Sequence, residues 1–538
     1  MKLKLIFVSM FALAALASCS NDNEGLDNGP SVPEQGPGAY LSVAINMPSS
    51  VNTRATGDTG PGSEAGTDGT NGTKDENEVN TVYLLTYKSG IRVGELRPLT
   101  PEELGTIGQG TTVAAAGEAI KVDKDIDEVF VVINPSAKTL SSITLNTNKS
   151  ALTTAIEESV NDLMLPATGF MMTSDSGFVA VVPKVAVTET TAGIDAAKQD
   201  AKNNPIKIGV DRAVVKTKLA AFTSTSVNTT NGTASVDGWK LNTTNKKYFP
   251  HAELVTYQKA GADVTDAKYR KDPNFTGLAM AADGTGAAAT EFNWLTNKTA
   301  VDWNNWTAPK DIEYCLENTM DAGSTNQNYN NTTKMIIKAR FAPTNVTLGT
   351  SWFRVGGVVL TFDELNASYA NASTTDKPKY EEFLDKLLDI VDDKGVVVTP
   401  RTKGWKGETG YTTEVALSDL DAVANGGYKA ATVTDGNYLI EYFQKSVCYY
   451  DVNLKHDNRV EPFLLGRWGV VRNNAYTVTI NKISQPGLPY IPDPTDPDIV
   501  DPSNPDPENP TPDDQESAFI AVSITVNNWT TWSQGVDL

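Results

Sequence analysis

Residues that could perform catalysis or bind a metal are few and scattered in this chain. It has 538 residues with three cysteines and two histidines, His251 and His456, whose positions form no recognisable set of metal ligands. No glycine-rich phosphate loop follows a predicted strand, and no G-x-S-x-G nucleophile elbow occurs. Carboxylates are numerous, so a glycosidase pair stays open as an alternative, although solvated surface charge is the simpler interpretation. We therefore expect no metal, no cofactor and no enzymatic activity.

Cys19 is the residue with the clearest predicted chemistry. A short basic start is followed by an apolar run over 5–17, which is too short to span a bilayer and is typical of a secretion signal. The run ends in Leu-Ala-Ser-Cys, which resembles a bacterial lipobox, where the cysteine thiol is acylated and the chain is cut just before it. We predict a signal peptide over 1–18 and lipid attachment at Cys19, which anchors the precursor in a membrane. The alternative is an ordinary signal peptide with an incidental cysteine.

The remaining cysteines and the tryptophans have simple structural interpretations. Cys315 and Cys448 lie in apolar, strand-like runs, and we predict buried free thiols rather than a disulfide bridge. Several tryptophans could form a carbohydrate platform, but this residue is more often found in a core or on a sheet. Those considered are Trp303, Trp306, Trp352, Trp405 and Trp468.

Arg54 lies between two segments of opposite character. Residues 57–80 after it are rich in Gly, Thr, Asp and Asn, and we expect a mobile loop there. Residues 39–47 before it alternate as a half-buried strand requires, with one face made of Leu41, Val43, Ile45 and Met47. Extended chain beside such a loop is accessible to proteases, so the Arg54–Ala55 bond is a candidate cleavage site. An ordinary surface arginine is the alternative, and Arg92 is another candidate for such a cut.

The elements that follow are mostly short strands. We predict strands over 81–87, 128–134, 178–182, 206–210, 213–219 and 472–483, and helices over 151–163 and 377–393. Many short strands with few helices indicate β-sandwich domains, and the length suggests two or three compact units. We place an N-terminal β-sandwich domain at 55–215 and a C-terminal one at 216–485.

The C-terminal end combines a stiff segment with an isolated strand. Residues 486–516 are rich in Asp and Pro, which favours an extended spacer. Residues 517–538 then contain a strictly alternating segment with Ile520, Val522, Ile524 and Val526 on one face, followed by Trp529. An apolar strand without neighbours along the chain is suited to completing the sheet of another molecule. Folding back onto its own C-terminal domain is the alternative.

The charge of the chain argues against nucleic acid as a partner. There are 45 basic and 66 acidic residues, a formal net charge of −21. Because an acidic surface repels phosphate backbones, nucleic-acid binding is disfavoured.

Taken together, these segments resemble the Mfa-type fimbrillins, the stalk subunits of type V pili of Gram-negative bacteria. The resemblance is carried at the start by the lipobox, the strand over 41–47 and Arg54. At the end it is carried by 472–480 (Arg-Asn-Asn-Ala-Tyr-Thr-Val-Thr-Ile), the Asp/Pro spacer and the terminal strand with Trp529. The triplet Glu317-Asn318-Thr319 after Tyr314 is also similar to a recurring fimbrillin segment.

The resemblance implies a fold and an assembly mechanism. It implies two transthyretin-like β-sandwich domains in a surface fimbria, exported as a lipoprotein precursor in the outer membrane. An arginine-specific protease would cut at Arg54–Ala55 and release the first strand, which lies within 19–54. The C-terminal strand of an identical subunit would then fill the emptied groove, and such a heterologous contact grows a filament. Anchor and tip subunits of the pilus are further implied partners.

Three other functions stay open at this point. A surface glycan-binding lipoprotein would share the β-domains and the anchor, but it needs no terminal donor strand. An anchor or accessory subunit of the same pilus is the second alternative, and a glycosidase is the third.

Overall fold

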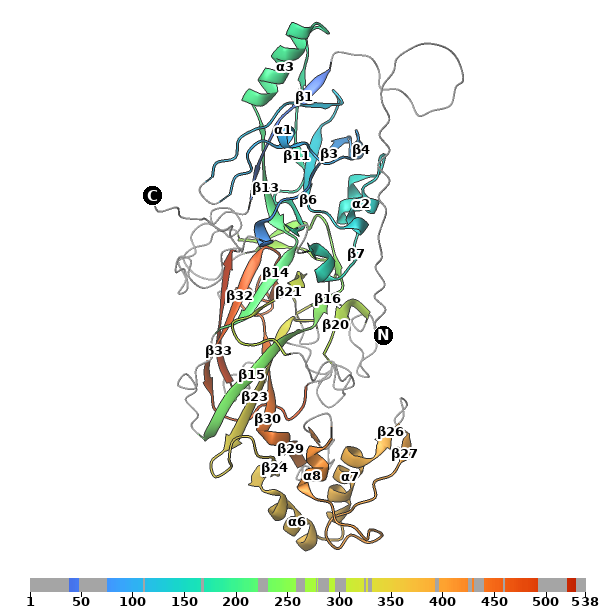
Figure 1. The fold of residues 1–538 in the computed structure, drawn as a ribbon, viewed down its shortest axis with the longest axis vertical. Coiled ribbons are helices and arrows are strands. Elements are labelled where there is room, and N and C mark those ends of the chain that lie inside the picture. The colour runs from blue at the N-terminus through green and yellow to red at the C-terminus, as the bar shows by residue number, and fades with distance from the viewer. Residues whose placement is uncertain are drawn as a thin grey trace, which may run out of the picture.

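The protein is mostly β and is elongated, and its longest helices lie at the two ends of its long axis (Figure 1). The computed structural model describes residues 38–47, 75–109, 112–165, 169–220, 231–257, 267–276, 278, 290–295, 306–323, 326–327, 331–391, 396–423, 428–429, 440–457, 460–491 and 520–528. Within this part of the chain no helix is long and apolar enough to cross a membrane.

The N-terminal part is built on two sheets that share one hydrophobic core. The larger sheet has the order β2 (Val43–Asn46), β13 (Ile206–Arg212), β10 (Met172–Ser174), β6 (Glu128–Ile133), β3 (Val82–Lys88) and β4 (Ile91–Val93), with β11 (Val179–Ala180) also paired to β6. The smaller sheet has the order β12 (Lys184–Val185), β1 (Ala39–Leu41) and β5 (Ile120–Val122). Buried side chains from both sheets form what we call the N-terminal core, in which Val129 to Ile133 of β6 are all fully buried.

Short helices surround this part. They are α1 (Pro101–Leu104), α2 (Ala137–Ser142) and α3 (Thr191–Asn203), with 3₁₀ turns η1 (Asp75–Asn77), η2 (Lys149–Thr153) and η3 (Val160–Leu163). The predicted helix over 151–163 is wrong, since η2 and η3 flank a strand, β7 (Ile156–Glu157), in that segment. The reason is tertiary: β7 pairs with the distant β17 (Lys247–Tyr248), and both Leu152 and Leu163 reach the N-terminal core.

The C-terminal part is a sandwich of two sheets. One has the order β21 (Ile312–Leu316), β14 (Val214–Leu219), β32 (Asn474–Ile483) and β33 (Ile520–Asn528), and the other has β15 (Gly232–Asn242), β23 (Lys334–Pro343) and β30 (Val447–Asn453). Alternate residues of both sheets meet in the C-terminal core, as period-two side-chain alternation requires. Trp239 and Met335 come from one sheet, and Val478 comes from the other.

Short two-stranded pairs fill the space around these sheets. They are β8 (Met164–Leu165) with β9 (Gly169–Phe170), β16 (Thr244–Asn245) with β20 (Phe292–Asn293), β18 (Leu254–Tyr257) with β19 (Ala267–Arg270), and β22 (Asn318–Thr319) with β31 (Gly469–Val470).

A third hydrophobic cluster lies in a lobe between β23 and β30, which the sequence did not predict as a separate unit. Its strands are β24 (Trp352–Val355), β25 (Val358–Leu360), β26 (Ile390–Val391), β27 (Val397–Thr399), β28 (Tyr428–Lys429) and β29 (Ile440–Phe443), and its helices are α6 (Phe362–Asn371), α7 (Lys377–Leu388) and α8 (Leu417–Asp421), followed by the turn η5 (Gln444–Ser446). Phe383 and Leu384 of α7 pack on Trp405 and Tyr442 within this lobe core. The lobe occupies the end of the molecule opposite α3 (Figure 1).

Candidate strand-exchange sites

The first strand is inserted deeply into the N-terminal part. Leu41, Val43, Ile45 and Met47 are all buried in the N-terminal core, as their alternation predicts. The other face is covered as well, because Tyr40, Ser42 and Ala44 are also buried. Apart from the exposed Asn46, the segment is therefore enclosed on both faces rather than half-buried.

The chain changes sheets at Ser42. β1 runs antiparallel between β12 and β5, whereas β2 runs parallel to β13, with Val43 opposite Ile206. At the change, the Ile206 amide donates to the Ser42 carbonyl (2.8 Å), and the Ser42 hydroxyl donates to the Gly117 carbonyl (3.2 Å). One nine-residue segment thus bridges the two sheets of the N-terminal part.

A second neighbour closes the other side of β2. The Gly108 amide donates to the Ile45 carbonyl (2.8 Å), and the Met47 amide donates to the Gly108 carbonyl (2.8 Å). A Cβ atom at Gly108 would lie 2.5 Å from Oδ1 of Asn46, so glycine permits this close approach. Strand β2 therefore sits in a groove between β13 and the segment at Gly108, and removing it would expose backbone groups on both walls.

The C-terminal strand is placed differently. β33 pairs antiparallel with β32 of its own chain, with Ile524 opposite Val478 and Val526 opposite Tyr476. Ile520 and Val526 are buried in the C-terminal core, while Val522 and Ile524 pack against it and are partly exposed. In the described part of the chain β33 is the edge of its sheet. The fold-back that the sequence left open is thus the arrangement of this single chain.

The long connection before β33 is unusual for a hairpin. Ile520 lies opposite Ile483, and residues 484–519 separate them. Two adjacent antiparallel strands need a loop of about two to five residues. The segment just after β32 still has contacts, because Tyr449 and Leu488 form a bridge and Ile491 is buried beside Ile336. The Asp/Pro-rich remainder is much longer than a return to β32 requires.

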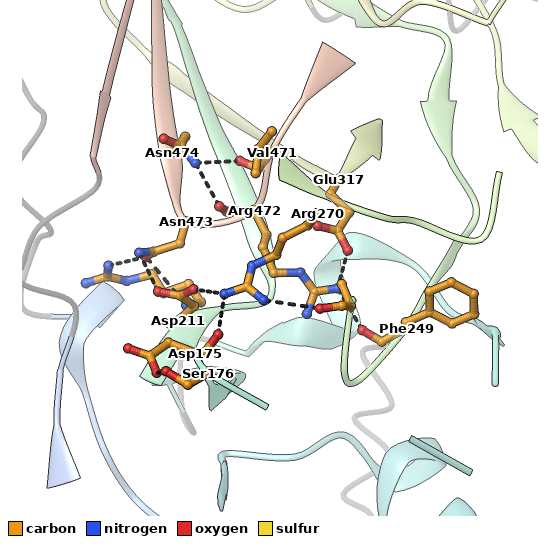
Figure 2. Close-up of polar contacts among 12 residues, drawn as sticks. Asp175, Ser176, Asp211, Phe249, Arg270, Glu317, Val471, Arg472, Asn473 and Asn474 are labelled. Carbon is orange, nitrogen blue, oxygen red and sulfur yellow. Dashed lines mark hydrogen bonds and ion pairs between the residues drawn. The ribbon is translucent and has the colours of Figure 1, made fainter. Parts of the chain in front are cut away.

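A buried polar network joins the N-terminal and C-terminal parts next to β32 (Figure 2). Arg472 is ion-paired with Glu317 and donates to the Phe249 carbonyl (2.7 Å). Asn473 donates from Nδ2 to Oδ1 of Asp211 (3.0 Å) and accepts from Nη1 of Arg212 (3.1 Å). Two of the segments that carried the family resemblance, 317–319 and 472–480, thus meet in one junction.

Other buried charges extend this junction. Asp211 is ion-paired with Arg270, and burial raises the pKa of Asp211. Burial also lowers the pKa of Arg212 to about 10, although nearby Glu76 opposes that shift. Glu76 is in turn paired with Lys216 at 3.0 Å. These residues were missed from the sequence, because no local pattern marks a charge that becomes buried only where distant parts of the chain meet.

The remaining candidates for chemistry have structural roles. Cys315 and Cys448 are buried free thiols, as predicted, and burial raises the pKa of Cys448 to about 12. His251 packs edge-on against Phe130 and Phe178, and burial lowers its pKa to about 4. His456 shares a hydrogen bond of 2.8 Å with the Tyr476 hydroxyl. Among the described residues no cluster of His, Cys, Asp and Glu has the form of a metal site.

The tryptophans do not make a platform in the described structure. Trp352, Trp405 and Trp468 are each 1% exposed and lie in or beside the cores. Trp306 is partly buried, and Trp303 lies outside the described residues.

Four predicted site residues also lie outside the described residues. These are Cys19, Arg54, Ala55 and Trp529. Arg92 is described, and it is 2% exposed on β4 with its guanidinium donating to the Thr144 carbonyl (2.9 Å). A protease cannot reach a side chain held in that way, so the structure disfavours Arg92 as a substitute cleavage site.

Comparisons with known proteins point to one family at the C-terminal end. Residues 441–535 match the family described as major fimbrial subunit protein type IV, fimbrillin, C-terminal. The matched region contains β30, β32, the Asp/Pro segment and β33. No curated protein sequence matches the chain.

Solved structures similar to this chain share only 10–12% of its sequence. A putative cell adhesion protein from Parabacteroides distasonis is 12% identical, with 93% of this chain and 99% of that chain covered and a TM-score of 0.39. The tip fimbrial protein Mfa3 from Porphyromonas gingivalis is 11% identical, covering 92% and 100%, with a TM-score of 0.33. A fimbrial protein from Bacteroides vulgatus is 10% identical, covering 91% and 99%, with a TM-score of 0.28. The family match at 441–535 is the finding that bears on function, and it supports a fimbrillin-type protein of mostly β structure.

Proposed function

We propose that this protein is a structural subunit of a surface fimbria, which polymerises when its C-terminal strand fills the groove of another copy. The observation that carries the proposal is the fimbrillin match over 441–535, which includes the proposed donor strand. In the described part of the chain, the two thiols are buried and the two histidines pack against aromatic rings. Support also comes from the two terminal strands themselves.

The two terminal strands carry the same side-chain pattern. Residues 41–46 read Leu-Ser-Val-Ala-Ile-Asn, and residues 522–527 read Val-Ser-Ile-Thr-Val-Asn. Aliphatic residues occupy three alternate positions in each, with Ser and Asn at matched places between them. A groove shaped for the first segment therefore suits the second, with Val526 taking the place of Ile45.

The length of the spacer supports delivery to a neighbour. Residues 492–519 extended at about 3.1 Å each would reach on the order of 90 Å. Pairing of β33 with β32 of the same chain does not require a spacer of this length, whereas insertion into the groove of another copy does. Because donor and acceptor surfaces differ, each added copy exposes a new donor or groove, and growth continues as a filament.

Exchange then requires that two strands leave their present positions, the first strand and β33. Cleavage at Arg54–Ala55 frees the first strand from the chain, so that its groove can open. β33 must leave the edge of its own sheet, where it pairs on one side with β32. In the groove, β33 would form backbone hydrogen bonds along both of its edges instead of one. This gain in hydrogen bonding favours exchange without an external energy source.

Before maturation, lipid on Cys19 would hold the precursor in the outer membrane, as the lipobox implies. An arginine-specific protease is the partner that this scheme requires. Anchor and tip subunits would begin and end the filament, and an accessory role of this chain in the same fimbria is the nearest alternative. A fatty-acid probe that labels the native protein and fails to label Cys19→Ala tests the anchor.

Paired cysteines test the exchange directly. Thr525 lies opposite Thr477 in its own chain, and the pattern match would place it opposite Lys207 of the acceptor copy, which is where Ala44 lies now. Chains carrying Thr525→Cys with Lys207→Cys should form disulfide-linked ladders in oxidised filaments. Thr525→Cys with Thr477→Cys should instead give internal bridges in the unpolymerised precursor.

The ladder must disappear when either cysteine is absent. Filaments that assemble normally while keeping the Thr525–Thr477 bridge in every copy would refute the exchange, because β33 would never have left its own sheet.

A further inference from the structure

A buried lysine lies beside a carboxylate and a carboxamide in the C-terminal sandwich. Lys334 begins β23, its side chain is 4% exposed, and its Nζ lies 3.7 Å from Oδ2 of Asp451 on β30. In the pairing of β23 with β30, Lys334 is directly opposite Asn453. Directly opposed side chains have Cβ atoms about 4.5–5.5 Å apart, so the Lys334 and Asn453 side chains start from neighbouring positions on the two strands.

These three residues share one face of the sheet. Met335 and Ile337 point into the C-terminal core, so Lys334 and Ile336 point the other way, as strand alternation requires. Asn453 and Asp451 lie opposite Lys334 and Ile336 in the register, which places them on this same outer face.

That face is covered by apolar side chains. Ile336, Tyr449 and Ile491 form a buried cluster there, with Trp306 packed against it. Burial lowers the pKa of Lys334 well below its usual range, because an ammonium is costly to desolvate. A neutral amine is the nucleophilic form of lysine.

We propose that Lys334 and Asn453 form an isopeptide bond, with Asp451 as the group that moves the protons. The arrangement assigns three roles to three neighbouring side chains: nucleophile, carbonyl electrophile and acid–base group. The chain itself supplies every reactant, so no cofactor and no oxidant is needed. This inference does not depend on the proposed role in a fimbria.

The reaction is balanced as a transamidation. Asp451 accepts a proton from the Lys334 ammonium, and the neutral Nζ attacks Cγ of Asn453. The Nζ–Cγ bond forms, and Asp451 relays a proton from Nζ to the leaving amide nitrogen. The Cγ–Nδ2 bond then breaks, and ammonia leaves and takes up the proton that Asp451 first accepted. The products are one secondary amide and one ammonium ion, and Asp451 ends as the carboxylate.

The bond would tie together the two strands from which the lobe extends. β23 ends at Pro343 and β30 begins at Val447, so the lobe lies between them in the sequence, and the strands run side by side in Figure 1. A covalent link at their far ends would prevent these strands from separating when the lobe or the neighbouring sheet is pulled.

Peptide mapping of the full-length protein tests the bond. Trypsin cuts after free lysine but not after an acylated one, so the expected product joins a peptide that runs through Lys334 to Lys338 with peptide 446–455. Its mass should be lower than the sum of the two parts by one molecule of ammonia. Normal cleavage after Lys334 with both peptides unmodified would overturn the proposal.

Variants distinguish the roles. Asn453→Ala should abolish the joined peptide, and Asp451→Asn should reduce its yield at least tenfold in protein of the same age. Asn242→Ala is the matched control, because Asn242 flanks Lys334 on the other side in β15 and should leave the yield unchanged. Loss of water instead of ammonia, with the link mapped to Asp451, would refute the assignment of Asn453 as the electrophile.

Discussion

The first strand and the last strand of this protein have the same sequence pattern but opposite structural situations. β2 lies between β13 and the segment at Gly108, and residues on both of its faces are buried. β33 lies at the edge of its sheet, with Val522 and Ile524 partly exposed. The alternation that makes a strand fit a groove therefore does not by itself fix how firmly the strand is held. We expect the number of backbone neighbours to set how firmly each strand is held.

The largest expected effect comes from keeping the first strand in place. Arg54→Ala should stop filament growth altogether, because the uncut strand continues to fill the groove that a donor needs. Electron microscopy of cells and N-terminal sequencing of sheared protein are the measurements. Arg92→Lys is a useful companion, since Arg92 is buried and its replacement should leave maturation unchanged. Abundant filaments from the Arg54→Ala strain would remove this residue from the mechanism.

The next largest effect is a loss of stability at the buried junction around Arg472. Arg472→Leu should lower the free energy of unfolding by about 3–5 kcal/mol, because it leaves the Glu317 carboxylate buried without its ion-pair partner. Chemical denaturation of the purified precursor measures this. The double variant Arg472→Leu with Glu317→Leu should recover part of the loss, and a loss of less than 1 kcal/mol in the single variant would contradict the structure.

Truncating one isoleucine in each terminal strand measures how firmly that strand is held. Ile45→Ala should cost about 2–5 kcal/mol, because Ile45 is fully buried. Ile524→Ala should cost less than about half of that in the precursor, since its side chain is partly exposed. Equal losses in urea melts would show that the edge strand is held as firmly as the enclosed one, and the proposed exchange would lose its basis.

Acid should weaken the N-terminal part through His251. Its folded pKa of about 4 lies below the unfolded value near 6.5, so the unfolded chain binds more protons between those values. The stability contributed by the neutral ring is therefore complete above pH 6.5 and is lost as the pH falls toward 4. The loss should be on the order of 2 kcal/mol at pH 5.

Melting curves at pH 7.5 and pH 5 of the native chain and of His251→Leu measure that loss. The variant should remove the pH-dependent difference, because no ring then titrates beside Phe130. A variant with the same acid sensitivity as the native chain would assign the effect to other groups.

Elements with strong local signals could be predicted from the sequence. The alternation over 39–47 and from Ile520 to Val526 appears in the structure as β1, β2 and β33, and the predicted helix over 377–393 appears as α7, ending at Leu388. The predicted burial of Cys315 and Cys448 follows from the apolar runs around them. The proposed domain boundaries and the processing sites remain predictions.

Tertiary structure alone decided the pairing. The sequence could not show that the chain changes sheets at Ser42, that 151–163 contains β7 rather than a helix, or that 352–443 form a lobe with its own core. Nor could it show that Arg472 meets Glu317. The physical reason is that side-chain periodicity records which face of a segment is buried, whereas strand partners and buried ion pairs join residues that are far apart in the chain. Those contacts exist only once the chain has folded.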